Sequence, residues 1–571
     1  MALGPELVMA QSVEISREYL RGKVRRTESG DSWLTLLFSR DNALFFSWDP
    51  EFYGCCAARP DEIRVLSELS LSRPPVRSAV KSRLVGAELT GARTLNRDRV
   101  LRIDFRRALG AGIYQICRLL FEASGRYSNL MLLDEEDGVI EAAKHVYPEA
   151  NRYRSVIPGR PYVPPPPFEG TPAEDFTGDF SMLDGVAGIG RPLIDAIKRR
   201  RSGGGNVSLA YLGTAAAEPA VLQRIGSYVT LFPELLDGAS LINTGSALEA
   251  ARECVILPLL GRHTERVRKK TGAMLAQLVR SNDRKIAEAE ALLGDESEVL
   301  LLMRRGRLIL ANSASIAPRL GEVELSEWTE DGEVTHKIAL DPKKDASQNA
   351  ERYFARYKKK RAAAERAKKI LPRLRLEREE LREQSALLEC SGDALTMSMM
   401  MNELSPAARN TSAGRGRAAK TPPPHRRFDL EDAAAIFVGL SAKGNHYVTF
   451  RLALGDDIWL HAQGVPGAHV ILRFKSRPDA GTRERLIEAA AAAAARHSKA
   501  HESGRVRVDY TERKHVRAIT GGGLAQVTYK EFSTVTADTG AWAEFVSAYK
   551  TREAIHEAPG ENFSDRRGGI L

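Results

Sequence analysis

The residues best suited to chemistry in this sequence lie in the stretch DDIWLHAQGVPGAHVI, residues 456–471. Its alternation predicts a strand whose Ile458 and Leu460 face a core, which leaves alternate side chains together on an exposed opposite face. A turn and a second strand with Arg473 facing outward should follow. An aromatic ring beside imidazoles and a guanidinium suits stacking and phosphate contact with single-stranded RNA. The candidate RNA-binding residues are Asp457, Trp459, His461, Pro466, Gly467 and His469.

Two other interpretations of this stretch stay open. Aspartate and histidine could form a metal or acid–base site, but no further ligand follows at metal spacing. The nearby HSKAH, with His497 and His501, lacks the glutamate of the H-E-x-x-H zinc motif. The tryptophan and histidines could also be ordinary packed core.

A second candidate is GVAGIGRPLIDAIKRRR, which resembles a helix-hairpin-helix element. Gly188 and Gly190 would allow a tight turn whose N–H groups meet a nucleic-acid phosphate at a helix N-terminus. A plain glycine turn between packed helices is the alternative.

The third candidate is a basic helix. Residues 352–382 hold 13 Lys and Arg against four Glu, an excess larger than solubility requires. Lys358, Lys359 and Lys360 are its candidate phosphate contacts. Pro372 should kink or break this helix.

Composition narrows the class of protein. A chain of 571 residues with 43% hydrophobic residues is long enough for several folded domains. The net charge of +10 and pI near 9.3 favour a polyanionic partner. Neither a signal peptide nor an apolar run long enough for a membrane span is recognisable, so we expect a cytoplasmic protein. The five scattered cysteines include no C-x-x-C pair, so we expect buried thiols and no metal or other cofactor.

The elements that must position these residues indicate a multidomain α+β protein. Short apolar runs and helical stretches predict an N-terminal α+β domain that ends at a proline run. Helical patterns follow, and after them two long helices flank a small β-like tip, as in an antiparallel coiled-coil arm. NHYVTFRLAL predicts a strand of a C-terminal α/β domain. The predicted parts are 1–168 (N-terminal domain), 174–245 (helix-hairpin-helix domain), 255–404 (arm, tip about 300–342), 405–427 (flexible basic linker), 428–546 (RNA-binding domain) and 547–571 (polar tail).

Several motifs together resemble the NFACT family. DDIWLHAQGVPGAHVI, EAAAAAAARHSKA and VRVDYTERKHV are similar, in that order, to its C-terminal RNA-binding module. LNRDRVLRIDF and FEASGRYSNLMLL resemble its N-terminal domain, and NAERYFARYKKKR and VIPGRPYVPP also follow family order. The resemblance therefore covers nearly the whole chain.

The resemblance implies a ribosome quality-control factor. Such proteins bind the large ribosomal subunit and its rRNA while it still carries peptidyl-tRNA, and they recruit tRNA, here expected to be alanyl-tRNA. Residues are then added to the nascent chain without mRNA. The subunit's RNA makes the peptide bonds, so the factor itself is not an enzyme. The tRNA-binding residues implied by matching positions are Asp98, Arg99, Glu122, Gly125, Arg126 and Asn129.

Some positions depart from the family pattern. An Asp-Gly is usual near the N-terminus, a large apolar pair is usual at Ala123-Ser124, and Ala468 and His446 replace a usual serine and aspartate. The usual K-P-G turn is absent from GGGLAQV. These differences put the tRNA preference and the shape of the RNA surface in question. An ordinary ion pair in a turn is the alternative for Asp98 and Arg99.

Two other functions remain to be weighed. The family's N-terminal domains resemble formamidopyrimidine-type DNA glycosylases, whose nucleophile is a proline amine directly after the initiator methionine. Ala2 and Leu3 stand there instead, which argues against a DNA glycosylase. Some family members are described as fibronectin-binding surface adhesins, so fibronectin is a further expected partner if the protein is exported.

Overall fold

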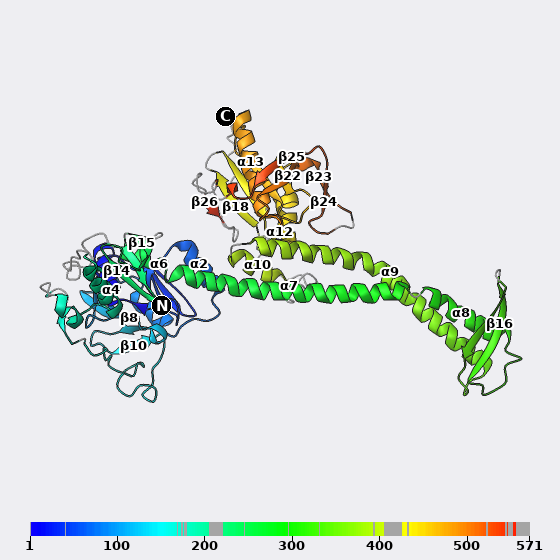
Figure 1. Ribbon diagram of the computed structural model, residues 1–571, viewed down its shortest axis with the longest axis horizontal. Helices are drawn as coiled ribbons and strands as arrows, with labels where there is room; N and C mark the ends of the chain where they lie inside the picture. Colours follow the sequence, from blue (N-terminus) through cyan, green and yellow to red (C-terminus); the bar gives the residue numbers. More distant parts are fainter. Residues whose placement is uncertain are drawn as a thin grey trace. The chain divides into compact units, whose positions relative to one another are not determined.

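The computed structural model describes residues 2–39, 42–167, 169–172, 175, 180–204, 221–244, 246–294, 296–329, 332–391, 394–404, 425–430, 433–520, 523–542, 545 and 552–554. Most of the predicted linker, 405–427, and of the predicted tail, 547–571, lies outside them. The chain forms two compact units, Met1–Arg266 and Val267–Leu571, which Figure 1 shows as a mixture of helices and sheets. The predicted multidomain α+β class is confirmed at this level.

The first unit is built on antiparallel sheets. One has the order β2-β3-β4-β5 and another β10-β9-β8-β7-β6, while β1, β14, β13 and β15 form a third in which β1 pairs parallel to β14. The strands are β1 Ala2–Leu3, β2 Arg26–Gly30, β3 Trp33–Leu37, β4 Ala43–Trp48, β5 Tyr53–Ala57, β6 Glu88–Thr94, β7 Val100–Gly110, β8 Ile113–Glu122, β9 Asn129–Leu133, β10 Val139–Ala142, β11 Thr171–Pro172, β12 Val186–Ala187, β13 Val221–Ile225, β14 Tyr228–Phe232 and β15 Ser240–Thr244. The helices are α1 Pro5–Glu18, α2 Pro60–Leu69, α3 Val76–Leu84, η1 Gly125–Tyr127, η3 Phe180–Gly185, α4 Arg191–Ser202 and α6 Ala247–Arg252.

One core joins the two domains that we predicted on either side of the proline run. Leu7, Ile103, Leu193 and Val229 belong to the same buried cluster. The proline run therefore does not separate two cores. The main core is shared by residues from both sides of it, while a smaller cluster around Leu120 and Met131 belongs to the N-terminal part alone.

The helical prediction after residue 174 is only partly correct. Helix α4 follows the glycine turn, but a 3-10 helix, η3, precedes it. Residues 205–220 lie outside the described part, and 221–232 form the hairpin β13–β14. Alternating Val, Leu, Ile and Tyr around Gly226, whose φ is +60°, favour that hairpin over a helix.

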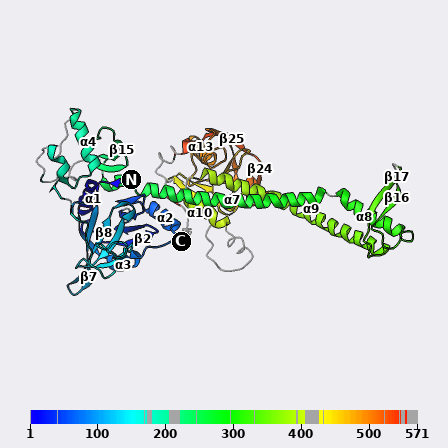
Figure 2. The same cartoon turned by 60° about the horizontal axis from the view of Figure 1, so that its bottom comes forward.

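Two long helices pack against each other in the second unit (Figures 1 and 2). Arg375 Nη2 lies 2.8 Å from Glu290 Oε1, whereas Lys360 pairs with Glu298. Nearer the start of α7, Arg268 Nη1 lies 3.3 Å from Leu388 O near the end of α9, so α7 and α9 run antiparallel, as predicted. The elements are α7 Ile256–Gly294, α8 Glu296–Ala311, β16 Glu322–Thr329, β17 Gly332–Ala339, α9 Ala346–Cys390 and α10 Ala394–Leu404.

Two details of this arm differ from expectation. Residues 300–311 are helical, so the tip is smaller than predicted and centres on the hairpin β16–β17. Helix α9 continues through Pro372 without a break. Leu371 and Leu374 on either side are buried between the helices, and this packing holds the turn that contains the proline.

A seven-stranded sheet of order β25-β22-β20-β21-β19-β18-β26 forms the C-terminal part. The predicted strand in NHYVTFRLAL is wrong, because the segment is helical and Ser441 caps it by accepting a 3.0 Å hydrogen bond from Gly444 N. The elements are β18 His425–Leu430, β19 Ala434–Gly439, α12 Ala442–Tyr447, a π-helical turn Val448–Leu452, β20 Ile458–Ala462, β21 Val470–Phe474, α13 Ala480–Arg496, β22 Arg505–Glu512, η6 Arg513–His515, β23 Val516–Ala518, β24 Val527–Tyr529, β25 Ser533–Asp538 and β26 Arg552–Ala554.

All five cysteines are free and buried, as predicted. Among the described residues, none of the helices has the length and apolarity that crossing a bilayer requires.

Candidate nucleic-acid interface

Asp98 and Arg99 lie in a tight turn that leads into β7. Asn96 and Arg97 both take left-handed backbone conformations, with φ of +53° and +52°. Asp98 Oδ1 accepts a 2.7 Å hydrogen bond from Arg99 N and lies 3.5 Å from Arg99 Nε. The Asp98 carboxylate therefore stabilises the turn in which it lies, while the Arg99 side chain stays 34% exposed.

The strand that follows supports this turn rigidly. Leu101, Ile103 and Phe105 are buried, as predicted from their alternation. Ala123 N donates to Arg99 O at 2.8 Å, which ties the turn to the end of β8. Arg99 is consequently held in a fixed position at the end of the sheet where β7 begins and β8 ends, which is called the sheet edge below.

Glu122 and Asn129 lie at the same edge, since Val100, Glu122 and Asn129 are neighbours in register. Both side chains are buried. Glu122 accepts a 2.7 Å hydrogen bond from Tyr162 Oη and pairs with Arg154. The polar atoms of these two residues bond to other parts of the protein. They therefore support the exposed residues of this edge and do not themselves face solvent.

Asn129 ties the next loop to this edge. Its side chain bonds both the N and the O of Lys144, at 2.9 and 2.8 Å. Lys144 Nζ in turn donates to the carbonyls of Trp48 and Arg126. Burial lowers the pKa of Lys144.

Gly125 and Arg126 form the exposed part of this edge. Gly125 has a φ of +61° and begins the short helix η1. The Arg126 guanidinium lies 4.7 Å from the Tyr127 ring centre, and Tyr127 is 69% exposed. Tyr127 was missed in the sequence, although an aromatic between arginine and serine in GRYS is the signal. An exposed ring beside a guanidinium can stack on a nucleobase.

The turn of Gly188 and Gly190 lies against the Asp98–Arg99 turn, but not all of its N–H groups are available to a ligand. A Cβ on Gly188 would lie 3.3 Å from Arg97 Cβ, so the two turns touch. Gly190 N donates to Glu6 Oε2 at 3.2 Å. The expectation that Gly190 meets a phosphate is therefore wrong in this structure, because a carboxylate occupies its N–H.

Glu6 is held firmly in that position. Its side chain is buried and also accepts hydrogen bonds from Tyr228 Oη, at 2.8 Å, and from Thr230. Burial raises the pKa of Glu6. Gly190 has no room for a side chain, since a Cβ there would overlap the Tyr228 hydroxyl.

The arm carries its basic residues in two different ways. Lys360 is engaged with Glu298 across the helices, whereas Lys358 and Lys359 are exposed. Lys359 borders an open groove of about 830 Å³ near the tip. The other charged residues lining this groove are Asp341, Lys343, Lys344, Glu351, Arg352 and Arg356. Positive charge in a groove favours the phosphates of a nucleic acid.

The C-terminal stretch is packed inside its domain, which corrects the predicted exposed face. Trp459 has no exposed surface. Its ring stacks on His461, with centres 5.8 Å apart, and lies 4.9 Å from Tyr529. The reason is that both faces of β20 are covered: α13 lies on one, while Val448 and Val516 pack beside Trp459 on the other.

The two candidate histidines cannot serve as cationic phosphate ligands there. Burial lowers the pKa of His461 to about 4 and that of His469 well below its usual value. His469 Nδ1 is 2.8 Å from Thr449 Oγ1. Both rings are therefore neutral at physiological pH.

The remaining candidates of this stretch are also engaged within the domain. Asp457 Oδ2 lies 2.7 Å from Arg473 Nη2. Pro466 O accepts a hydrogen bond from Lys499 N at 2.9 Å, and Gly467 O accepts one from Asn445 Nδ2 at 3.1 Å. The structure thus brings the predicted residues together. Asp457, Trp459, Gly467 and His469 belong to the packed core that the sequence left open, and His461 and Pro466 are half-buried beside it.

Comparison with known proteins gives a consistent family. Residues 8–189 and 261–412 match the family model for the NFACT N-terminal and middle domains, more than half of the chain. The Rqc2 homolog RqcH of Bacillus subtilis is 28% identical over 486 residues, covering 77% of this chain and 82% of that protein. The Rqc2 homolog RqcH of Streptococcus suis is 24% identical over 481 residues, covering 79% and 83%.

A solved structure is also similar in part. The C-terminal part of the fibronectin/fibrinogen-binding protein from Streptococcus suis is 23% identical, with a TM-score of 0.32, covering 48% of this chain and 95% of that one.

Proposed function

The chain belongs to the NFACT family, and on that premise we propose that it is a cytoplasmic ribosome quality-control factor. It binds large ribosomal subunits that still carry peptidyl-tRNA and recruits tRNA, alanyl-tRNA being the expected species, so that residues are added to the nascent chain without mRNA. The subunit supplies the peptidyl-transferase chemistry, and this protein is not itself the enzyme. The observation that carries the proposal is the similarity to Rqc2 homologs over 77% of the chain.

The sheet edge around Arg99 supports the tRNA part of the proposal. Arg99 and Arg126 offer planar guanidinium groups, which can contact phosphate or a base edge with two hydrogen bonds. Tyr127 adds a ring for stacking. Because β7 and the Asn129–Lys144 contacts fix the backbone that carries these side chains, less entropy is lost on RNA binding than from an unsupported loop.

The arm supports the subunit part of the proposal. Lys358 and Lys359 are exposed and Lys359 borders the basic groove near the tip. Such a surface binds the phosphates of structured RNA without reading sequence. Contacts by the arm and by the sheet edge are then separable by mutation.

A double substitution, Asp98→Ala with Arg99→Ala, tests the proposal. We expect tRNA co-purification and C-terminal tailing to be lost while binding to the large subunit is kept. The measurements are sequencing of the RNA that co-purifies with the tagged protein and mass spectrometry of nascent-chain tails. The matched control is Glu88→Ala with Arg106→Ala, a pair 3.9 Å apart on the neighbouring strands β6 and β7.

Two results would contradict the assignment. Wild-type tailing in the double variant would mean that the Asp98–Arg99 pair is only structural. Loss of subunit binding in proportion to tRNA would mean that the first unit does not act separately from the arm. The alternative, fibronectin binding at the cell surface, requires export, and a blot of cell fractions tests it by locating the protein.

A further inference from the structure

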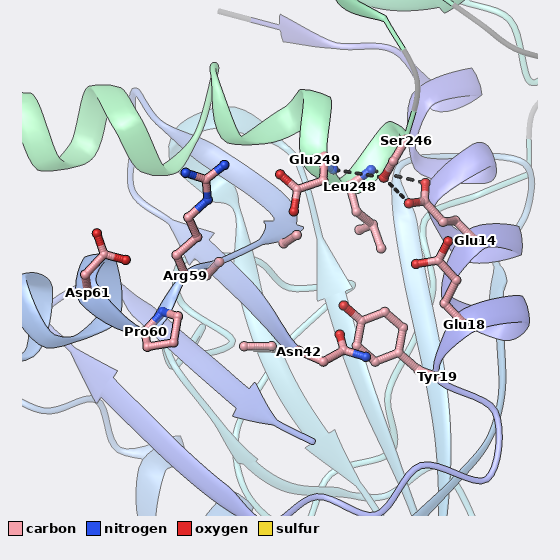
Figure 3. A pocket seen from close by; sticks show the side chains of 13 residues that line it. Glu14, Glu18, Tyr19, Asn42, Arg59, Pro60, Asp61, Ser246, Leu248 and Glu249 are labelled. Carbon is pink, nitrogen blue, oxygen red and sulfur yellow. Dashed lines mark hydrogen bonds between the residues drawn. The ribbon is translucent and has the colours of Figure 1, made fainter. Parts of the chain in front are cut away.

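A pocket of about 400 Å³ opens in the first unit between α1, α2 and α6 (Figure 3). None of the residues assigned to RNA lines it. Its volume falls within the range of roughly 300–1,000 Å³ that is typical of small-molecule sites.

The pocket is acidic although the protein as a whole carries a net charge of +10. Among the described residues that line it, the carboxyl groups are those of Glu14, Glu18, Asp61 and Glu249, and the one guanidinium is that of Arg59. In Figure 3 the carboxyl groups of Glu18 and Glu249 point toward the cavity from α1 and α6. Glu18 also lies 3.1 Å from Arg17 and Glu249 3.6 Å from Arg252, two arginines outside the lining. Within the lining the carboxyl groups outnumber the guanidinium, which favours a cation.

Tyr19 supplies an independent sign of a ligand. Its side chain is 4% exposed and its ring packs edge-on against Phe38, with centres 5.0 Å apart. No described residue forms a hydrogen bond with its hydroxyl, which points into the cavity in Figure 3. The ring is thus buried while the hydroxyl opens only to the cavity, where a bound donor can reach it.

The phenol is well suited to accept from a cation. Burial raises the pKa of Tyr19, and the nearby Glu18 and Glu14 raise it further. The hydroxyl therefore stays neutral, with lone pairs free for a donor. The Glu18 carboxylate would attract a positive charge to it, whereas Glu14 accepts hydrogen bonds from Ser246 and Leu248 N, and burial raises its pKa.

The arrangement of the acids argues for an organic cation rather than a metal ion. No cluster of three His, Cys, Asp or Glu among the described residues is close enough to hold a metal. An ammonium group carries three donors, and two carboxylates with a phenol hydroxyl provide three acceptors. Ala43, Ala57 and Leu248 also line the pocket and can contact methylene groups.

We propose that this pocket binds an organic cation with primary ammonium groups on an aliphatic chain. One ammonium donates to Glu18, Glu249 and the Tyr19 hydroxyl, and the methylene groups lie along the apolar lining. The chemistry is that of a free polyamine or of a lysine side chain on a partner protein. This inference does not depend on the proposed function.

Calorimetry on the full-length protein tests it with two probes, spermidine and a lysine peptide flanked by glycines. We expect one saturable site for at least one probe, and the tighter probe identifies the source. Tyr19→Phe should weaken binding about tenfold, since a hydrogen bond to a charged group is lost. Glu18→Gln with Glu249→Gln should abolish it. Both carboxylates are about half exposed, so this variant keeps its fold.

The controls are Tyr153→Phe and Glu149→Gln, exposed residues outside the pocket, together with a fully acetylated spermidine that carries no charge. Control variants should bind as the unsubstituted protein does, and the acetylated compound should not bind. The proposal is overturned if neither probe gives saturable heat. It is equally overturned if binding is unchanged in Tyr19→Phe and in the double glutamine variant.

Discussion

Replacement of Trp459 by alanine should destabilise the C-terminal sheet strongly. Trp459 is fully buried, and truncating a buried tryptophan costs about 3–5 kcal/mol. We expect the upper end, because the ring centres of His461, His469 and Tyr529 lie 5.8, 5.2 and 4.9 Å away. Each aromatic contact of this kind adds about 0.5–1.5 kcal/mol.

A phenylalanine at the same position separates shape from hydrogen bonding. Trp459 Nε1 is buried and has no hydrogen-bond partner among the described residues. Trp459→Phe removes this unpaired donor, worth about 1–3 kcal/mol, and keeps one aromatic ring. The penalty for phenylalanine should therefore be well below that for alanine, under about 2 kcal/mol.

Hydrogen exchange in the full chain is the suitable assay, because a protein with two compact units does not unfold in one two-state step. The amides of β20 and β22 report the local free energy of opening. Unchanged protection in Trp459→Ala, combined with weaker RNA binding, would refute the buried assignment and restore the exposed RNA-facing strand.

Three further predictions concern other parts of the chain. Burial lowers the pKa of His461 and of His497 to about 4 from 6.5. Because the unfolded state then binds more protons, the stability of the C-terminal sheet should fall as pH drops from 6.5 toward 4, by about 1.4 kcal/mol per histidine at pH 5.5. Equal exchange protection at pH 7 and pH 5.5 would contradict this prediction. Lys358→Glu with Lys359→Glu should make subunit binding depend less on salt: the slope of log binding constant against log salt concentration should decrease by about one unit for each phosphate that the arm no longer neutralises. The circular dichroism spectrum should stay the same, and an unchanged slope would mean that the arm does not contact the subunit. Arg252→Ala leaves its buried glutamate partner unpaired and should cost the first unit about 3–5 kcal/mol, which thermal melting checks against an exposed arginine variant.

Local patterns were sufficient for much of the framework. The alternation in VLRIDF predicted the buried residues of β7, because a strand fixes which side chains share a face. Helical periodicity predicted the antiparallel arm, since a long apolar seam requires a partner of similar length. The ordered motifs also predicted the family to which the chain belongs.

Other features depend on parts of the chain that are far apart in sequence. Alternation placed Trp459 on one face of β20, but only the packing of Val448 and Val516 decided that this face is covered. The N–H of Gly190 was predicted to meet phosphate, and only the fold brings the Glu6 carboxylate to it.

The acidic pocket shows the same limit of local patterns. Its carboxylates come from positions 14, 18, 61 and 249, and none of the segments that carry them is unusual alone. Periodicity determines how a side chain is oriented on its own element, because it depends on backbone geometry alone. Whether that side chain meets solvent, a partner or a cavity depends on which distant segment packs against it, and only the tertiary structure determines that packing.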